Sequence, residues 1–166
     1  MKLADAMQVY FRGERNFGIA LAVLGLVMMA AAAWIWRAHA APFKWWLLVP
    51  FAVVGVGASV GGALFALKTE RQVARLVDQV AKDEPATAGA ELARMEKVNA
   101  NWPRLKLGWT ALTALALVLL MVVKKEWASG LGLALMTLAT VLFFTDVFAE
   151  RRAAPYTAAL EATAKR

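Results

Sequence analysis

The sequence contains no cysteine and a single histidine, His39, and these shortages exclude several classes of site. Without cysteine the chain has no disulfide, no thiolate metal site and no thiol nucleophile. With one histidine, most zinc sites and histidine-based catalytic arrangements are excluded as well. The sequence also lacks a P-loop, an H-E-x-x-H motif and a G-x-S-x-G motif. We therefore expect no enzyme, no cofactor and no bound metal.

Apolar residues, in contrast, are in large excess. They make up 61% of the 166 residues, whereas ordinary soluble domains contain about 45–50%. A soluble fold of this size leaves about a third of its unfolded surface exposed to water, so its interior is too small for that many apolar side chains. The composition predicts an integral membrane protein.

Four apolar runs are suited to crossing a bilayer, which requires a helix of about 20 residues. The runs are 17–36, 45–67, 107–123 and 127–149, and Asp146 is the one charged residue within them. Ala38-His39-Ala40 matches a signal-peptide cleavage site, but the first run is longer than the roughly 7–15 apolar residues of a signal peptide. We therefore expect the first run to be retained as a membrane span.

The distribution of lysine and arginine predicts the orientation of the spans. All of the 19 Lys and Arg residues except Arg37, Lys44, Lys124 and Lys125 lie in three segments, 1–16, 68–106 and 150–166. Basic segments stay in the cytoplasm, so both termini and the middle segment are expected there, with the protein in a bacterial inner membrane. The net charge of +7 is then a topology signal, and because it is not gathered into one patch we expect no nucleic-acid partner.

The middle segment 68–106 predicts a cytoplasmic helical hairpin. Val73, Leu76, Val77 and Val80 continue the second span at helical spacing, and Asp83-Glu84-Pro85 breaks that helix. A second short helix is expected over 87–100, with Asn101 at the N-cap of the third span. We expect the two apolar stripes to pack on each other; the alternative is a groove for a partner. The tail 156–166 is expected to be a frayed helix, and the fold class is an all-α bundle of four transmembrane helices with this hairpin.

Small residues in the second span predict close helix packing. Membrane helices associate through small residues four positions apart, because these let two backbones approach. The helix-packing candidates are Gly55, Gly57, Ala58, Gly61 and Gly62. We expect this face to pack within the bundle, and a homo-oligomer is the alternative.

Three charged residues lie at the cytoplasmic interface of the spans, namely Arg12, Glu14 and Asp146. Asp146 is expected to be hydrated or to pair with Arg12 or Arg15. The alternative is a functional carboxylate, since ionisable groups inside the membrane often carry ions or protons. Under that hypothesis the protein is a small oligomeric transporter or channel that uses Asp146 or Glu14.

Tryptophan gathers at the outer ends of the spans, where indole rings favour the lipid headgroup level. These residues are Trp34, Trp36, Trp45, Trp46 and Trp127. Anchoring explains them, but tryptophan is also common in binding hot spots. The candidate partner-binding residues are therefore Arg37, Lys44, Trp45, Trp46, Lys124 and Trp127.

Three short segments carry a resemblance, namely Tyr10-Phe11-Arg12-Gly13-Glu14, Lys68-Thr69-Glu70-Arg71-Gln72-Val73 and residues 91–98. Together they resemble a group of small four-span bacterial inner-membrane proteins without assigned activity. The overall plan is similar to that of polytopic immunity proteins, which protect bacteria from pore-forming or membrane-depolarising toxins. Four packed spans with small loops and no catalytic signature lead us to expect a non-enzymatic protein that binds a membrane-embedded partner, either a toxin, as for an immunity protein, or a complex subunit. A membrane scaffold acting through the hairpin is a further alternative.

Overall fold

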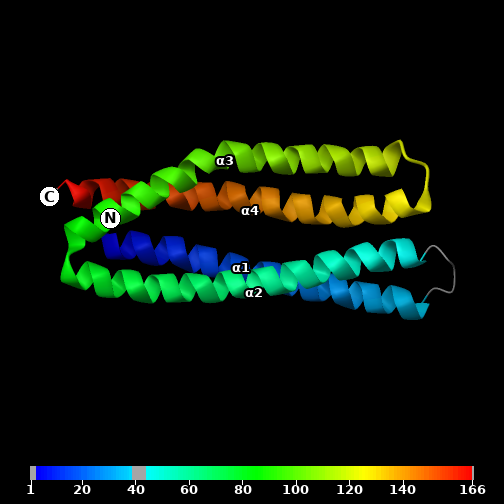
Figure 1. Ribbon diagram of the computed structural model, residues 1–166, viewed down its shortest axis with the longest axis horizontal. Helices are drawn as coiled ribbons and strands as arrows, with labels where there is room; N and C mark the ends of the chain where they lie inside the picture. The colour runs from blue at the N-terminus through cyan, green and yellow to red at the C-terminus, as the bar shows by residue number, and fades with distance from the viewer. Residues whose placement is uncertain (1–2, 39–43, 166) are drawn as a thin grey trace.

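The protein is a bundle of four long α-helices that run up and down (Figure 1). The computed structural model describes residues 3–38 and 44–165, so His39 and Ala40 of the cleavage-site pattern lie outside the described residues. The helices are α1 (Leu3–Ala38), α2 (Lys44–Lys82), α3 (Glu84–Met121) and α4 (Glu126–Ala164). Both chain termini and the α2–α3 turn lie at one end, here called the terminal end. The opposite end, where α1 and α3 finish, is called the far end.

Each of the four helices is long and apolar enough to cross a membrane, as the apolar runs predict. Large apolar side chains stay exposed along the middle of the bundle, including Val27, Val53, Leu115 and Phe144. Soluble proteins rarely expose apolar patches of this extent, whereas lipid accommodates them. The all-α prediction is confirmed, and the exposed apolar surface indicates a multi-pass membrane protein.

The helices α1 and α2 contact each other backbone to backbone. A Cβ atom added at Gly62 would lie 2.5 Å from both the Gly18 carbonyl oxygen and the Ala22 nitrogen. Farther along, Gly25 lies against the Gly55 carbonyl and Ser59, whose hydroxyl donates a hydrogen bond to the Ala22 carbonyl at 3.3 Å. Small residues allow this approach because they carry little or no side chain. The antiparallel pair is therefore held by matched small residues on both helices.

The small residues of α2 divide between two faces. Gly55 and Gly62 lie buried at the α1 contact and Ala58 is also buried, whereas Gly57 and Gly61 are exposed, with no atom within 4 Å of an added Cβ. Residues four apart share a helix face, and residues one apart do not. The packing within the bundle thus uses the 55–58–62 stripe and leaves the 57–61 stripe facing outward.

The helices α3 and α4 form the second antiparallel pair, which joins the first through α4. At the far end, Gly132 of α4 packs on Leu120 and the Ala116 carbonyl of α3. Two residues earlier, Gly130 lies against the backbone carbonyl of Trp46 in α2. These alternate glycines let α4 approach both α3 and α2.

At the terminal end the helices share one hydrophobic core. It combines the start of α1, the end of α2, the start of α3 and the end of α4, and it includes Leu3, Tyr10, Leu76, Met95, Tyr156 and Leu160. The prediction of a frayed tail is wrong, because α4 continues to Ala164 and both Tyr156 and Leu160 are 1% exposed. Their helical spacing places them on the face that meets α1, so packing stabilises the tail.

The predicted hairpin does not form a separate unit. The expected continuation of the second span is present, and Asp83 does end α2 and cap α3, accepting a hydrogen bond from the Ala86 amide at 3.0 Å. However, α3 runs without interruption through Asn101 and Pro103, so the predicted helix boundary there is wrong. Proline is tolerated inside long membrane helices when neighbouring groups compensate for the lost hydrogen bond. Most residues of the two apolar stripes, namely Val73, Leu76, Leu92, Met95 and Val98, pack in the core shared with α1 and α4, whereas Val77 is 49% exposed, which differs from the expected stripe.

Two neighbouring glycines test this packing. Gly62→Ala places a methyl group against the backbone of α1, and we expect it to lower the free energy of unfolding by about 1–3 kcal/mol, as overpacking does. Gly61→Ala is the matched control, and it should be neutral or stabilise the helix by about 0.5–1 kcal/mol. Thermal unfolding in detergent, followed by circular dichroism, measures both variants. Equal effects of the two substitutions would contradict the assigned contact face.

Candidate functional site

Ionisable side chains meet at the terminal end in an arrangement here called the polar cluster. Its members come from α1, α3 and α4, and they are Tyr10, Glu14, Glu91, Arg94, Arg152 and Tyr156. All six lie outside the four apolar runs, where the helices continue beyond the expected bilayer. The cluster therefore belongs to the part of the bundle beyond the expected bilayer, where the interior is packed as in a water-soluble protein.

Glu91 is the centre of the polar cluster. Its side chain is 6% exposed, and its two carboxylate oxygens accept hydrogen bonds from Arg94 at 2.6 and 2.8 Å. The Tyr156 hydroxyl donates to the same carboxylate at 3.1 Å. Such a bidentate, charge-assisted pair satisfies a buried carboxylate, which would otherwise be costly. Glu91 thus connects α3 to α4 through a fully partnered charge.

Aromatic rings enclose this pair on the α1 side. The Tyr10 and Tyr156 rings are stacked, with centroids 4.8 Å apart and planes 18° apart. Phe11 meets both tyrosines edge to face, and the Arg94 guanidinium lies 6.0 Å from the Phe11 centroid. Stacked and edge-to-face rings stabilise a contact beyond the area they bury. The rings bring the first turns of α1 and the end of α4 into a fixed arrangement.

Burial changes the proton affinity of the groups in the cluster. Burial and then the nearby Glu14 charge raise the pKa of Tyr10 to about 12, while burial and Glu91 raise the pKa of Tyr156 further. Burial also raises the pKa of the Glu14 carboxyl, although the Arg152 charge opposes the rise. The Glu14 and Arg152 side chains approach to 3.8 Å, a loose ion pair. The tyrosines therefore remain neutral hydrogen-bonding groups at physiological pH.

Asp146 does not pair with Arg12 or Arg15, so that prediction is wrong. Its carboxylate accepts a hydrogen bond of 2.6 Å from the Trp109 indole of α3. Arg15 instead approaches Glu70 of α2 at 3.6 Å. Trp109 faces α4 across the α3–α4 pair, which places an indole donor nearer to Asp146 than any α1 arginine. Asp146 is thus partnered within the bundle.

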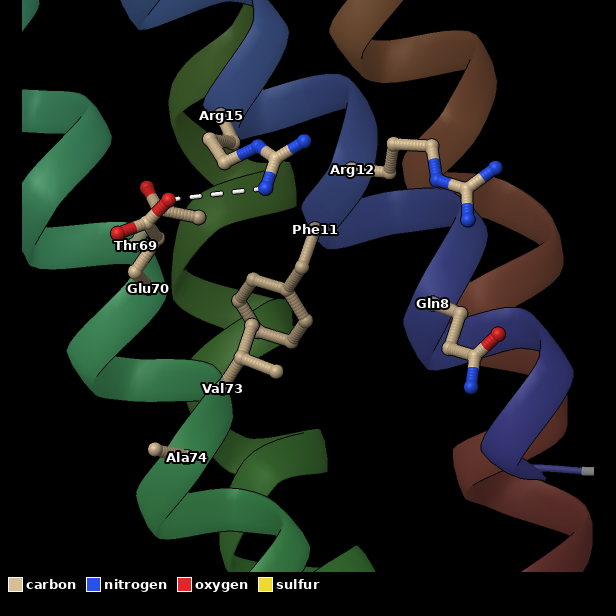
Figure 2. Close-up of a pocket in the computed structure, with 8 residues that line it drawn as sticks. All are labelled: Gln8, Phe11, Arg12, Arg15, Thr69, Glu70, Val73 and Ala74. Atoms are coloured by element: carbon tan, nitrogen blue, oxygen red, sulfur yellow. Dashed lines mark ion pairs between the residues drawn. The ribbon is translucent and has the colours of Figure 1, made fainter.

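A recess opens between α1 and α2 at the terminal end, with a volume of about 420 Å³ (Figure 2). Figure 2 shows Phe11 and Val73 pointing toward each other across it and Arg15 reaching to Glu70, while Arg12 points away from Glu70. The other lining residues are Gln8, Thr69 and Ala74. Thr69 donates its hydroxyl to the Phe65 carbonyl of its own helix, so it is already satisfied. This recess, here called the inner recess, is lined by two cations, Arg12 and Arg15, and by one carboxylate, Glu70, which pairs with Arg15.

The predicted partner-binding residues lie at the far end of the bundle. Trp45, in the first turn of α2, meets Trp36 of α1 edge to face, with centroids 4.9 Å apart. The Trp46 side chain remains 48% exposed, although its carbonyl packs on Gly130 of α4. Trp127 lies one turn before Gly130 and is 38% exposed. The structure therefore brings these tryptophans from three helices to one end. Lys44 begins α2, and Lys124 lies in the short connection before α4.

An apolar groove with a volume of about 610 Å³ lies between α1 and α2, and its lining includes Trp36, which contacts Trp45. Its wall is made of small and flexible side chains, and Trp36 and Arg37 stand at its end. The lining residues are Met29, Ala32, Ala33, Trp36, Arg37, Leu48 and Ala52. Alanines give a shallow wall that another helix backbone can approach closely. This feature is called the far-end groove.

Sequence reasoning missed the polar cluster, although two signals pointed to it. Residues 10–14 and 91–98 stand out as short motifs in the sequence, and the structure brings them together through Tyr10, Glu91 and Arg94. The spacing of Glu91 and Arg94 also favours an ion pair along one helix. The two tyrosines of the chain, far apart in sequence, gave no indication of their contact.

Comparisons with protein families, curated proteins and solved structures find no match to this chain. The function is therefore argued from the geometry of the chain itself.

The two tyrosines give a direct test of the polar cluster. Their raised pKa values mean that the folded state favours neutral phenols, so this stability is present below pH 10 and is lost as the pH rises through 10 toward 12. We expect little phenolate absorbance near pH 10 and its appearance at about pH 12 or with loss of helix. In Tyr156→Phe, the remaining Tyr10 should still titrate late. Ionisation of both tyrosines near pH 10 in a folded protein would contradict the cluster.

Proposed function

We propose that the protein is a non-enzymatic binding protein of a bacterial inner membrane, which holds another membrane-embedded protein by contacts within the bilayer. Its most concrete form is an immunity protein that neutralises a pore-forming or membrane-depolarising bacterial toxin. The observation that carries the proposal is the far-end groove, which Trp36 lines, together with the exposed tryptophans Trp45, Trp46 and Trp127 at the same end of the bundle. The apolar lining of this groove suits an apolar helix of a partner and offers no group for catalysis.

The orientation proposed from lysine and arginine makes the far end periplasmic. The terminal end, with both termini and the basic middle segment, then lies in the cytoplasm. A toxin that arrives from outside the cell meets the far end first. Trp45, Trp46 and Trp127 would contact it at the headgroup level, with Arg37, Lys44 and Lys124 attracting acidic groups beside them.

The groove then provides the lateral contact. Lipid solvates apolar helices as well as protein does, so association within the bilayer depends on close packing of small residues. The Ala32, Ala33 and Ala52 side chains allow a toxin helix to approach α1 and α2 closely. Held there, the helix is unavailable for the oligomer or pore that would depolarise the membrane.

The scaffold alternative has less support. A scaffold would need the apolar stripes of residues 73–80 and 92–98 to be available to a partner, but most of their residues, namely Val73, Leu76, Leu92, Met95 and Val98, pack in the shared core of the terminal end. If the partner is a complex subunit and not a toxin, it would bind in the same far-end groove.

Filling the groove tests the proposal. Ala33→Leu adds bulk to the groove wall, and we expect protection against the toxin to fall by about tenfold or more, since overpacking of this kind costs about 1–3 kcal/mol. The assay expresses the depolarising product of a neighbouring gene in sensitive cells and measures membrane potential with a voltage-sensitive dye.

The matched control is Ala20→Leu, an exposed alanine of the same helix outside the groove. It should preserve protection at equal membrane abundance. The immunity form of the proposal fails if no neighbouring gene product depolarises membranes, and the groove is the wrong site if both leucine variants behave alike.

Asp146 distinguishes binding from transport. In Asp146→Asn the amide oxygen still accepts the Trp109 hydrogen bond, but the charge is gone. A binding protein should keep protection within about twofold, because the residue does not line the far-end groove. A transporter or channel that uses this carboxylate should lose proton or potassium flux in proteoliposomes. Flux in the natural protein that disappears in Asp146→Asn would favour the transporter.

A further inference from the structure

A second cavity of the terminal end lies between α2 and α3, two helices with few direct contacts, and it has a volume of about 670 Å³. Six of its lining residues are on α2 and one is on α3. They are Leu64, Leu67, Lys68, Arg71, Gln72, Arg75 and Arg94. This feature, here called the basic cavity, is separate from the far-end groove and from the inner recess of Figure 2.

The basic cavity carries four cations and no carboxylate in its lining. Arg94 is engaged by Glu91, but Lys68, Arg71 and Arg75 make no ion pair with any of the residues 3–38 and 44–165 that the structure describes. Of the acidic residues near these cations along α2, Glu70 pairs with Arg15 on the α1 side, and Asp78, three residues after Arg75, does not line the cavity. Like charges three and four positions apart on a helix repel each other. The cavity therefore has an unbalanced positive potential that an anion would neutralise.

The apolar residues of the cavity identify the kind of anion. Leu64, Lys68, Arg71 and Arg75 are spaced four, three and four apart, so they form one stripe along α2. The leucine end of this stripe belongs to the apolar run, where Leu64 is 62% exposed, and the cations begin one turn later. A phospholipid has the same order of chemistry, with acyl chains on one side of a phosphate. A free phosphate would match the cations but not Leu64 and Leu67.

We propose that the basic cavity binds the headgroup of an anionic phospholipid from the leaflet at the terminal end. The phosphate lies among Lys68, Arg71 and Arg75, and the acyl chains follow Leu64 and Leu67. Basic pockets between helices at the cytoplasmic side of a membrane suit such headgroups. This inference does not depend on the identity of the protein partner.

Native mass spectrometry of the full chain tests the site. The protein is released from mixed micelles that contain phosphatidylglycerol and phosphatidylcholine, and retained lipid is counted. The test variant is Lys68→Gln with Arg71→Gln and Arg75→Gln. We expect the natural chain to retain one phosphatidylglycerol and the variant to bind it roughly 100-fold more weakly, given the contribution of each cation near a membrane surface.

The control removes the same net charge elsewhere, as Lys97→Gln with Arg104→Gln and Arg151→Gln, which are exposed and do not line the basic cavity. It should retain phosphatidylglycerol like the natural chain. Circular dichroism of both triple variants checks that the helices persist.

Three results would overturn the proposal. Equal loss of lipid in both triple variants would mean attraction by overall charge, and equal retention of phosphatidylcholine would mean no headgroup selectivity. The third result comes from a separate experiment, in which inorganic phosphate or glycerol 3-phosphate is added to the protein in neutral detergent. Displacement of the lipid by either anion at millimolar concentration, dependent on Lys68, Arg71 and Arg75, would assign the cavity to a soluble phosphate.

Discussion

Close backbone contact at small residues is the constraint on which the bundle depends. Inside a bilayer, an apolar side chain gains nothing by leaving lipid for protein, so bulky leucines and valines cannot hold two helices together as they do in water. The chain meets this constraint with Gly18, Gly25, Gly55 and Gly62 at the α1–α2 contact. Larger apolar side chains are left on the outside, which is why so many are exposed. The arrangement is the reverse of a soluble core.

The same helices follow ordinary rules once they pass beyond the apolar runs. At the terminal end, Leu76, Met95 and Leu160 pack in a core of large side chains, and a buried carboxylate is tolerated because Arg94 and Tyr156 satisfy it. There the hydrophobic effect operates fully, since water surrounds the helices. Each helix therefore has two parts with different stabilising forces, joined without a break. The polar cluster lies at the terminal end, in the part of the helices that the hydrophobic effect stabilises.

Much of the fold could be predicted from the sequence, because span length and apolar content are local properties. The four helices, the α2–α3 break at Asp83 and the small-residue character of α2 were all visible in the pattern. The continuity of α3 through Pro103 was not, since its stability depends on α1 and α4, which the local pattern does not contain. The fraying expected for the tail is wrong for the same reason: a short terminal helix is marginal by itself even when it is rich in alanine, and it is the burial of Tyr156 and Leu160 that stabilises it.

The side chains that meet in space were the least predictable feature. For Asp146 the sequence suggests water or an arginine partner, because its charge is the visible property, whereas the structure supplies an indole from the adjacent helix. The division of Gly55 and Gly62 from Gly57 and Gly61 likewise required knowledge of which face meets α1. Periodicity identifies a stripe, but only the packed structure identifies what lies against it.

The basic residues after the second span illustrate how one set of charges can serve two purposes. Lys68, Arg71 and Arg75 belong to the excess of cations that predicts a cytoplasmic middle segment. The membrane orientation requires only that such charges lie near the span. It does not require that they lie on the same face of the helix. Here all three share one stripe of α2 and open into one cavity. That shared direction is additional to what orientation requires, and anionic lipid is the component of the membrane that the arrangement matches.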